Sequence, residues 1–161
     1  MFIMIIGRPA SGKSFKAAEL KEQGFTVLSS DAVRAEKGYK NDNVQDNTTL
    51  FSFLRSEAAR LLEAGQDVAL DSTNTIAKYR KWFLDGLPGG IPKAAYFIDT
   101  PLELCIGRNA LRTKGRVPEW AYRKKFMQIQ PPSADEGFDR ITVFKTVFKM
   151  ENSIMETKNN K

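Results

Sequence analysis

The sequence predicts an α/β fold with three layers, in which helices cover both faces of a mainly parallel central sheet. Short apolar segments alternate with longer segments of helical periodicity, which is the pattern of a parallel sheet with crossover helices. A glycine-rich loop joins the first apolar segment to the first helical one, and polar residues follow the later apolar segments. Right-handed crossovers bring the ends of such strands to one edge of the sheet. We therefore expect residues 7–14, 30–31 and 71–73 to line one crevice.

The first half of the chain predicts two strands and three helices. Residues 2–6 form an apolar run that predicts a buried strand, and the loop GRPASGKS leads from it into a helix that Gly24 ends. FTVLSS (25–30) predicts a second strand, and a short helix follows from Asp31 to about Lys37. Residues 38–47 are polar and predict a loop. Residues 49–65 have apolar side chains at helical spacing and a terminal glycine, so they predict the clearest helix in the chain.

The second half continues the alternation. Residues 66–75 contain a third strand that ends at Asp71, and 77–87 predict a helix. A fourth strand is expected at 91–100 and a helix at 102–113. Pro118 precedes another predicted helix at 120–129, a loop spans 131–139, and 140–148 predict the last strand. The polar tail that follows is expected to fray.

Composition limits the chemistry that the chain can perform. Its 161 residues suit one domain, which we expect at 1–150, with a polar tail at 151–161. The net charge of +6 favours an anionic partner, although it also fits simple solubility. The chain has no histidine and a single cysteine, Cys105. Histidine catalysis and an internal disulfide framework are therefore excluded, and a general base must come from another residue type.

Neither a targeting segment nor a membrane span is predicted. The N-terminal FIMII is too short for a signal peptide, and no apolar run approaches the roughly 20 residues that span a bilayer. We expect a cytosolic protein without a membrane partner. No feature of the sequence indicates its oligomeric state.

The segment GRPASGKS matches the phosphate-binding pattern G-x-x-x-x-G-K-[ST] in full. Its glycines allow the backbone to wrap around phosphates, and the following helix presents its positive N-terminus to the same anion. Lys13 can reach the β- and γ-phosphates, and the Ser14 hydroxyl can ligate Mg²⁺. The alternative is a plain glycine turn, but the apolar strand before the motif and the helix after it favour nucleotide binding.

Two carboxylates follow predicted strands, and each has two interpretations. Asp31 can accept the proton of an acceptor hydroxyl, or it can cap the helix that begins there. Asp71 can bind Mg²⁺, or it can belong to a turn with its polar neighbours. Arg34 lies one helical turn beyond Asp31 and can hold an acceptor phosphate, or it is an ordinary surface arginine.

A basic segment, CIGRNALRTKGRVP, predicts a lid over the phosphates. Arg108 and Arg112 are four residues apart and would share one helix face. Such cations stabilise the charge that develops in phosphoryl transfer, whereas a charge run is otherwise a solvated surface. The guanine-binding pattern N-K-x-D is missing from the sequence, so a kinase is favoured over a GTPase.

Together, GRPASGKS, SSDAVR, LDSTNT followed by Arg80, and GRNALRTKGRVP resemble the kinase domain of phage polynucleotide 5′-hydroxyl kinases. More broadly they resemble the small P-loop kinases labelled AAA-type or zeta-toxin-like. The resemblance runs from about residue 1 to residue 140. The phosphate loop is shared by many families, but D-x-x-R after the second strand, D-[ST]-x-N after the third and R-N-x-x-R in the lid are more specific. The resemblance implies a P-loop kinase fold with a helical basic lid.

The resemblance also implies roles for individual residues. Asp31 is the expected general base, Arg34 contacts a phosphate of the acceptor, and Thr73 and Asn74 complete the acceptor site. Arg112 contacts the donor phosphates, and the expected catalytic set is Asp31, Lys13 and Arg112. The metal ligands are Ser14 and Asp71. The expected donor site comprises Gly7, Arg8, Pro9, Ala10, Ser11, Gly12, Lys13, Ser14, Phe15, Arg108 and Arg112.

Two departures from the family pattern concern this donor site. Phe15 stands where threonine is frequent, and Arg116 does not align with the later basic residue of the lid.

The implied activity is transfer of the γ-phosphate of ATP, or of another nucleoside triphosphate, to the 5′-hydroxyl of DNA or RNA with Mg²⁺. The rivals are a small-molecule kinase for a nucleoside, sugar or antibiotic, and a catalytically silent nucleotide-binding module. Aromatic residues, Tyr39 and Phe51 among them, can stack on bases, although helical spacing favours a core position for Phe51. No phosphatase or ligase domain follows, so a separate protein would supply those steps. The expected location is the bacterial cytosol, including that of a phage-infected cell.

Overall fold

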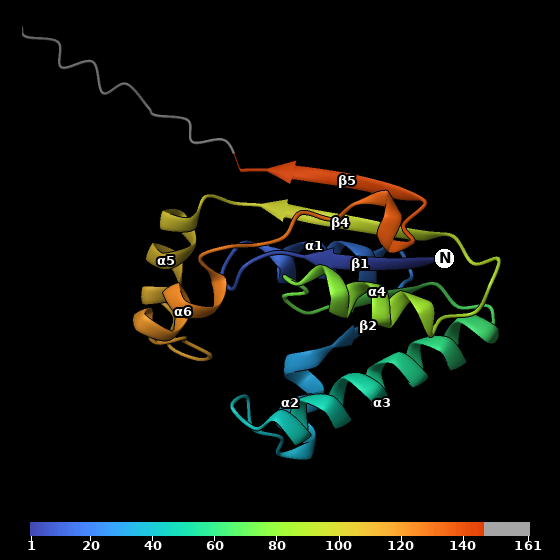
Figure 1. The fold of residues 1–161 in the computed structure, drawn as a ribbon, viewed down its shortest axis with the longest axis horizontal. Coiled ribbons are helices and arrows are strands. Elements are labelled where there is room, and N and C mark those ends of the chain that lie inside the picture. The colour runs from blue at the N-terminus through green and yellow to red at the C-terminus, as the bar shows by residue number, and fades with distance from the viewer. Residues whose placement is uncertain (147–161) are drawn as a thin grey trace, which may run out of the picture.

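The computed structural model describes residues 1–146 and contains one five-stranded parallel sheet with the strand order β2-β3-β1-β4-β5. Helices on both faces make it the three-layer α/β fold that the sequence predicts (Figure 1). The strands are β1 (Phe2–Ile6), β2 (Thr26–Ser29), β3 (Val68–Asp71), β4 (Lys93–Asp99) and β5 (Arg140–Lys145). The helices are α1 (Lys13–Glu22), α2 (Ser30–Lys37), α3 (Val44–Glu63), α4 (Ala77–Asp85), α5 (Leu102–Ala110), α6 (Glu119–Phe126) and the 3₁₀ helix η1 (Ala134–Glu136).

The central strand β1 explains the layering. All five of its residues are buried. Alternate side chains face opposite sides of the sheet, and helices cover both sides. Phe2 and Met4 face α3 and α4, whereas Ile3 and Ile5 face α1. The sequence of a strand that is covered on both faces is a continuous apolar run, and FIMII is such a run.

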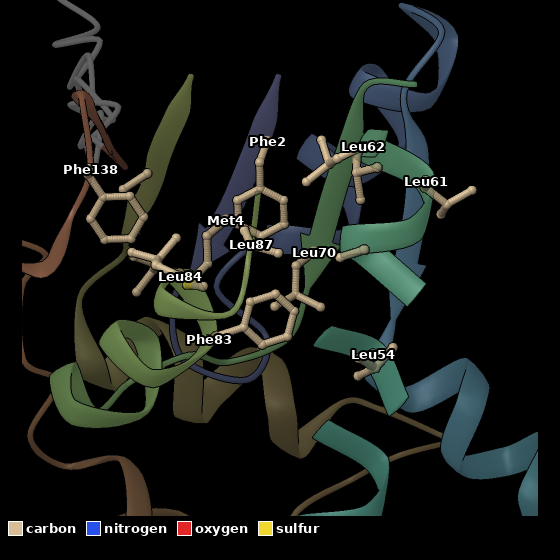
Figure 2. Close-up of a cluster of buried hydrophobic side chains, with 14 of the residues drawn as sticks. Phe2, Met4, Leu54, Leu61, Leu62, Leu70, Phe83, Leu84, Leu87 and Phe138 are labelled. Carbon is tan, nitrogen blue, oxygen red and sulfur yellow. The ribbon is translucent and has the colours of Figure 1, made fainter. Parts of the chain in front are cut away.

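The larger cluster of core side chains lies between the sheet and helices α3 and α4. Figure 2 shows Phe2, Met4 and Leu70 of the strands facing leucines of α3 together with Phe83 and Leu84 of α4. The rings of Phe2 and Phe83 are stacked with their centroids 5.7 Å apart. Burial of one such side chain contributes about 1.5–3 kcal/mol. This packing holds α3 and α4, which carry part of the candidate site, at fixed positions on the sheet.

Several predicted boundaries differ from the structure, among them the end of α6, which is Phe126 and not residue 129. Helix α3 begins at Val44, inside the predicted loop 38–47, because the Asn43 side chain caps it by accepting the N–H of Asp46. Helix α5 ends at Ala110 and not at residue 113. The predicted loop 131–139 contains η1, which Gly137 ends with a φ of +108°. The last part of the predicted strand 140–148 and the predicted tail lie outside the described residues.

Within residues 1–146, none of the helices combines the length and the apolar character that crossing a bilayer requires.

Candidate functional site

The carboxyl ends of β1, β2 and β3 lie side by side. Asp71 is in register with Ile5 on one side and with Ser29 on the other. The phosphate loop after β1 and helix α2 after β2 therefore begin at the same edge of the sheet, as the topology predicts. Figure 1 shows α5 and α6 beyond the ends of β4 and β5, next to this edge.

The two glycines of the phosphate loop are each required by the local geometry. A Cβ atom on Gly7 would lie 2.6 Å from the Ser11 hydroxyl and 3.1 Å from the carbonyl oxygen of Ile98. Gly12 has a φ of +110°, which is unfavourable for residues with a side chain. Gly12 also stands at the N-cap position of α1, where no side chain caps the helix. The first N–H groups of α1 are thus left for an anion.

Buried side chains from distant segments support the loop from outside. The Thr100 hydroxyl donates to the carbonyl oxygen of Ser11 at 2.8 Å, and the Tyr122 hydroxyl donates to that of Pro9 at 2.7 Å. Burial raises the pKa of Tyr122, so this hydroxyl keeps its proton and remains a donor. Sequence reasoning missed both residues, since a lone Thr after a strand and a Tyr in a basic helix carry no pattern that indicates such contacts.

Arg8 contributes to the loop differently from the prediction. Its guanidinium points away along the loop and donates to the carbonyl oxygen of Phe126 at 2.9 Å and more weakly to that of Thr100. The side chain therefore ties the loop to the end of α6. Arg8 can therefore contribute only its main chain to an anion site. Its carbonyl oxygen accepts a hydrogen bond from Lys13 Nζ at 2.7 Å.

Lys13 is buried among charges of both signs. Burial lowers the pKa of Lys13 to about 8; Arg112 lowers it further, whereas Asp71 and Asp31 oppose this effect. Burial also raises the pKa of Asp71; Asp31 adds to this effect and Lys13 opposes it. These effects agree with the strand register that brings the segments of Lys13, Asp31 and Asp71 to one edge of the sheet, and with the cavity that Lys13 and Arg112 both line.

Asp31 lies in the first turn of α2 but does not cap it. The cap is Ser29, whose hydroxyl accepts the N–H of Ala32 at 3.3 Å. The alternative interpretation of Asp31 as the helix cap is therefore wrong. Within the part of the chain that the structure describes, the Asp31 carboxylate is exposed and makes no hydrogen bond or ion pair with another residue.

Arg34 is half-buried on the same helix. Its Nη1 donates to the carbonyl oxygen of Lys40 at 3.4 Å. Its Nε is buried and has no hydrogen-bond partner among residues 1–146. A buried donor without a partner is uncommon in folded proteins. The guanidinium has further N–H donors besides the one that contacts Lys40, so Arg34 can pair with an anion.

The lid arginines face the phosphate loop across a cavity of about 250 Å³. Both Arg108 and Arg112 line it, together with Ala10, Gly12, Lys13, Ser14 and Phe15. Arg112 lies just beyond the end of α5, where its N–H donates to the carbonyl oxygen of Asn109. The buried Asn109 also closes the lid loop, because its amide group both donates to and accepts from the main chain of Val117, at 2.7 and 3.0 Å.

Thr73 and Asn74 do not line this cavity but a second one, of about 510 Å³, between α3 and α4. The Thr73 carbonyl oxygen accepts the N–H of Gly7 at 3.0 Å. The Asn74 amide donates to the carbonyl oxygen of Ile5 at 2.7 Å, and its backbone has a φ of +48°. The loop after β3 is thus fastened to the start of the phosphate loop. Asp31 and Arg34 line neither cavity.

Arg80 is another residue whose position could not be deduced from its place in the sequence. It is buried and forms a two-pronged ion pair with Glu136 at 2.6 Å. It also donates to the carbonyl oxygens of Asn74 and Gln130 at 2.9 and 2.8 Å. Arg80 therefore joins the loop after β3 to the segment that follows the lid.

A metal ion would have few protein ligands here. No group of three or more acidic, histidine or cysteine side chains suited to a metal occurs among residues 1–146. The available donors at the crevice are the Ser14 hydroxyl and the Asp71 carboxylate. Hard oxygen ligands in small number suit Mg²⁺, which commonly binds one or two carboxylates together with substrate phosphates.

Solved structures with the same fold include several kinases. A sugar kinase from Janibacter sp. HTCC2649 matches 89% of this chain and 84% of its own, with a TM-score of 0.71 and 17% identity. The APS kinase CysC from Mycobacterium tuberculosis, in complex with AMPPNP and APS, matches 88% of this chain and 87% of its own, with a TM-score of 0.61 and 23% identity. A chain of the Pnkp1/Rnl/Hen1 RNA repair complex matches 79% of this chain but 43% of its own, with a TM-score of 0.70 and 19% identity. No curated protein matches the sequence.

The family model described as "AAA domain", AAA_33, matches residues 2–131. This range contains the phosphate loop, both crevice carboxylates and both lid arginines. The predicted P-loop kinase fold is confirmed, whereas the finer resemblance to polynucleotide kinases stays a prediction. The chain belongs to the AAA_33 family, and its fold is that of the P-loop kinases.

Proposed function

We propose that the protein transfers the γ-phosphoryl group of ATP to the 5′-hydroxyl of DNA or RNA. The observation that carries this proposal is the strand register at one edge of the sheet. It brings together Asp71 and the starts of the segments that carry Lys13 and Asp31, with Arg34 one turn beyond Asp31. A phosphate cradle, a carboxylate that has no other partner within residues 1–146 and an arginine near it are the parts that a kinase with a phosphorylated acceptor needs.

The donor triphosphate lies in the 250 Å³ cavity in this proposal. The uncapped N-terminus of α1 and the Lys13 ammonium hold its phosphates, and Arg108 and Arg112 approach from the lid. The cations neutralise charge on the transferring group, and removal of one such group typically costs about 10²–10³-fold in rate. Ser14 and Asp71 hold Mg²⁺, which when bound neutralises further negative charge on the β- and γ-phosphates.

The transfer step uses Asp31 as the base. The acceptor hydroxyl oxygen forms a bond to the γ-phosphorus while the bond from that phosphorus to the β,γ-bridging oxygen breaks and ADP leaves. The hydroxyl proton moves to the Asp31 carboxylate, which no helix cap or ion pair within residues 1–146 occupies. Most of the rate acceleration comes from positioning and charge neutralisation, as in other phosphoryl transfers.

The acceptor is assigned from Arg34 and from the charge of the whole chain. A phosphate of an oligonucleotide forms a charge-assisted pair with the Arg34 guanidinium, whereas a sugar or nucleoside without a phosphate offers it only neutral acceptors. The net charge of +6 attracts a polyanion. A phosphatase or a ligase activity would complete the end-healing reaction, and we place the protein in the cytosol.

The direct test is transfer of labelled γ-phosphate to a panel of acceptors. The panel includes 5′-hydroxyl DNA and RNA oligonucleotides, nucleosides, sugars and aminoglycosides. We expect labelled oligonucleotides and negligible labelling of compounds without a phosphate. Labelling of a small molecule alone would establish the rival kinase, and slow ATP turnover with every acceptor would indicate a silent nucleotide-binding module.

Replacement of Arg34 by alanine is expected to raise the KM for the oligonucleotide by about tenfold or more, while the KM for ATP changes little. A charge-assisted hydrogen bond contributes about 1.5–3 kcal/mol, and this one is made only to the acceptor. Steady-state kinetics with each substrate varied in turn gives both constants. Lys37→Ala, at the other end of α2, is the matched control for the loss of positive charge. Equal effects on the KM values of both substrates would contradict this role.

ATP binding is expected to weaken by roughly tenfold between about pH 7 and pH 9. The pKa of Lys13 is about 8 in the free protein, and bound phosphates favour its charged form, so the complex keeps a proton that the free protein loses above pH 8. Calorimetric titrations in buffers of different ionisation enthalpy measure this proton uptake. Lys13→Arg, which stays charged throughout, should abolish the proton uptake. If ATP binding to that variant still took up protons as in the wild type, Lys13 would not be their acceptor.

A further inference from the structure

The 510 Å³ cavity between α3 and α4 differs in chemistry from the phosphate cavity. None of its eleven lining residues is charged. Its walls include the rings of Phe51, Tyr79, Trp82 and Phe83, with the hydroxyl of Thr48 beside them. Its volume lies within the range of about 300–1,000 Å³ that is typical of small-molecule sites. The cavity is therefore suited to a flat, largely apolar ligand with a few polar edges.

The cavity adjoins the start of the phosphate loop and the first turns of α3. Its Thr73 accepts the N–H of Gly7, the first residue of the phosphate loop. On the opposite side, Val44 and Thr48 belong to the first turns of α3, which packs against α2. Helix α2 carries Asp31 and Arg34, so the helix that forms one wall of the cavity also contacts the helix of the proposed base.

Several of the exposed apolar side chains of the protein line this cavity. Val44, Ile76, Tyr79 and Trp82 all line it, and Tyr79 and Trp82 are 59% and 38% exposed. Single exposed apolar residues are common on protein surfaces, but a contiguous group of them marks a binding site.

The Trp82 ring is held in place before any ligand arrives. The Arg55 guanidinium lies 3.8 Å from the ring centroid, and its Nη1 donates to the Trp82 carbonyl oxygen at 3.1 Å. Gly86 makes room for this arginine, because a Cβ atom there would lie 2.5 Å from Arg55 Cδ. The neighbouring Phe83 stacks on Phe2 in the core, as Figure 2 shows. A rigid aromatic wall loses little entropy when a ring packs against it.

We propose that this cavity binds the nucleobase of the 5′-terminal nucleotide of the acceptor. The proposal rests on the proposed function and names the part of the substrate that this site recognises. A base stacks on Tyr79 and Trp82, and its polar edge meets the amide of Asn47 and the hydroxyl of Thr48. The phosphate stays outside, next to Arg34, because the cavity offers it no cation.

The experiment compares a 5′-hydroxyl oligonucleotide with the same oligonucleotide carrying an abasic 5′-terminal residue. Stacking of one base on aromatic side chains changes affinity by about fivefold to a hundredfold. We expect the wild type to prefer the intact acceptor in kcat/KM by such a factor. Tyr79→Ala and Trp82→Ala should bring this ratio close to one without changing the KM for ATP.

Phe53→Ala is the matched control. Phe53 lies on α3, is 40% exposed and lines neither cavity, so this variant should keep the wild-type ratio. Thermal unfolding of each variant verifies that the fold is intact.

Binding without transfer is measured by Trp82 fluorescence in a Trp120→Phe background, which removes the other tryptophan. A 5′-deoxy oligonucleotide, which has no hydroxyl to phosphorylate, should quench Trp82 more strongly than its abasic counterpart. If oligonucleotides are phosphorylated but intact and abasic ends react equally, the base site is overturned and the proposed function stands. If no oligonucleotide is phosphorylated but the intact one still quenches selectively, the proposed function fails and the base site stands. Failure of both readouts overturns both proposals.

Discussion

Asp31→Asn is expected to slow phosphoryl transfer by about 10²–10⁴-fold while ATP still binds. General base catalysis contributes a factor of this size, and asparagine cannot accept the proton of the attacking hydroxyl. The substitution leaves helix α2 intact, because Ser29 provides the cap and the Asp31 side chain has no other partner within residues 1–146. Single-turnover transfer to an oligonucleotide measures the rate, and calorimetric titration with a non-hydrolysable ATP analogue measures nucleotide affinity.

The control is Glu36→Gln, which neutralises another exposed carboxylate on the same helix. This variant should transfer phosphate at close to the wild-type rate. If Asp31→Asn also retained that rate, another group would have to take the proton, and the proposed roles of Asp31 and α2 would be lost. A variant that binds neither nucleotide nor oligonucleotide would instead point to a structural role for Asp31.

The fold and the donor half of the site could be predicted because they depend on local signals. The apolar run FIMII, the glycine loop and the following helix occupy adjacent positions in the sequence. The parallel topology then determines which strand ends meet, so the convergence of the phosphate loop with Asp31 and Asp71 follows from element order alone. The register of Ile5, Asp71 and Ser29 at this edge of the sheet agrees with that deduction.

The parts that could not be predicted depend on side chains that meet only in three dimensions. Asp31 and Ser29 are both good caps, and only the path of the chain decides that Ser29 fills this position. The polar residues at the start of α3 predicted a loop, whereas the Asn43 side chain caps a helix that begins there. The second cavity joins residues 44–51 to residues 73–83. No sequence pattern relates those two segments, although Phe51 itself was predicted as a core residue and does pack against the core.

One buried cation holds both the loop after β3, which lines the 510 Å³ aromatic cavity, and the segment that follows α6. Arg80 donates to the carbonyl oxygens of Asn74, in the loop that lines the aromatic cavity, and of Gln130 and Pro131, which follow α6 of the lid. Its charge is balanced by Glu136, which also accepts the N–H of Ser133. This network connects the loop after β3, the end of the lid and the segment that leads into β5.

Loss of Arg80 is therefore expected to destabilise the protein strongly. Arg80→Met should lower the free energy of unfolding by about 3–5 kcal/mol, because it leaves Glu136 as a buried charge without its partner. Arg80 is 1% exposed and Glu136 5% exposed, so water does not replace the lost contacts. For a chain of this length the change corresponds to a decrease in Tm of about 6–20 °C. Urea denaturation at neutral pH measures the free energy directly.

A matched control lies on the same helix. Lys81 pairs with Asp85 at 2.9 Å, but both side chains are more than half exposed, and Lys81→Met should cost less than about 0.5 kcal/mol. The double variant Arg80→Met with Glu136→Leu removes the unpaired charge, and we expect it to recover part of the loss. A loss below about 1 kcal/mol in Arg80→Met would contradict the role of this ion pair. If stability fell as expected while the preference for an intact terminal base survived, the aromatic cavity would keep its shape without Arg80. We expect the opposite, because Asn74 and the lid segment would lose the cation that holds them together.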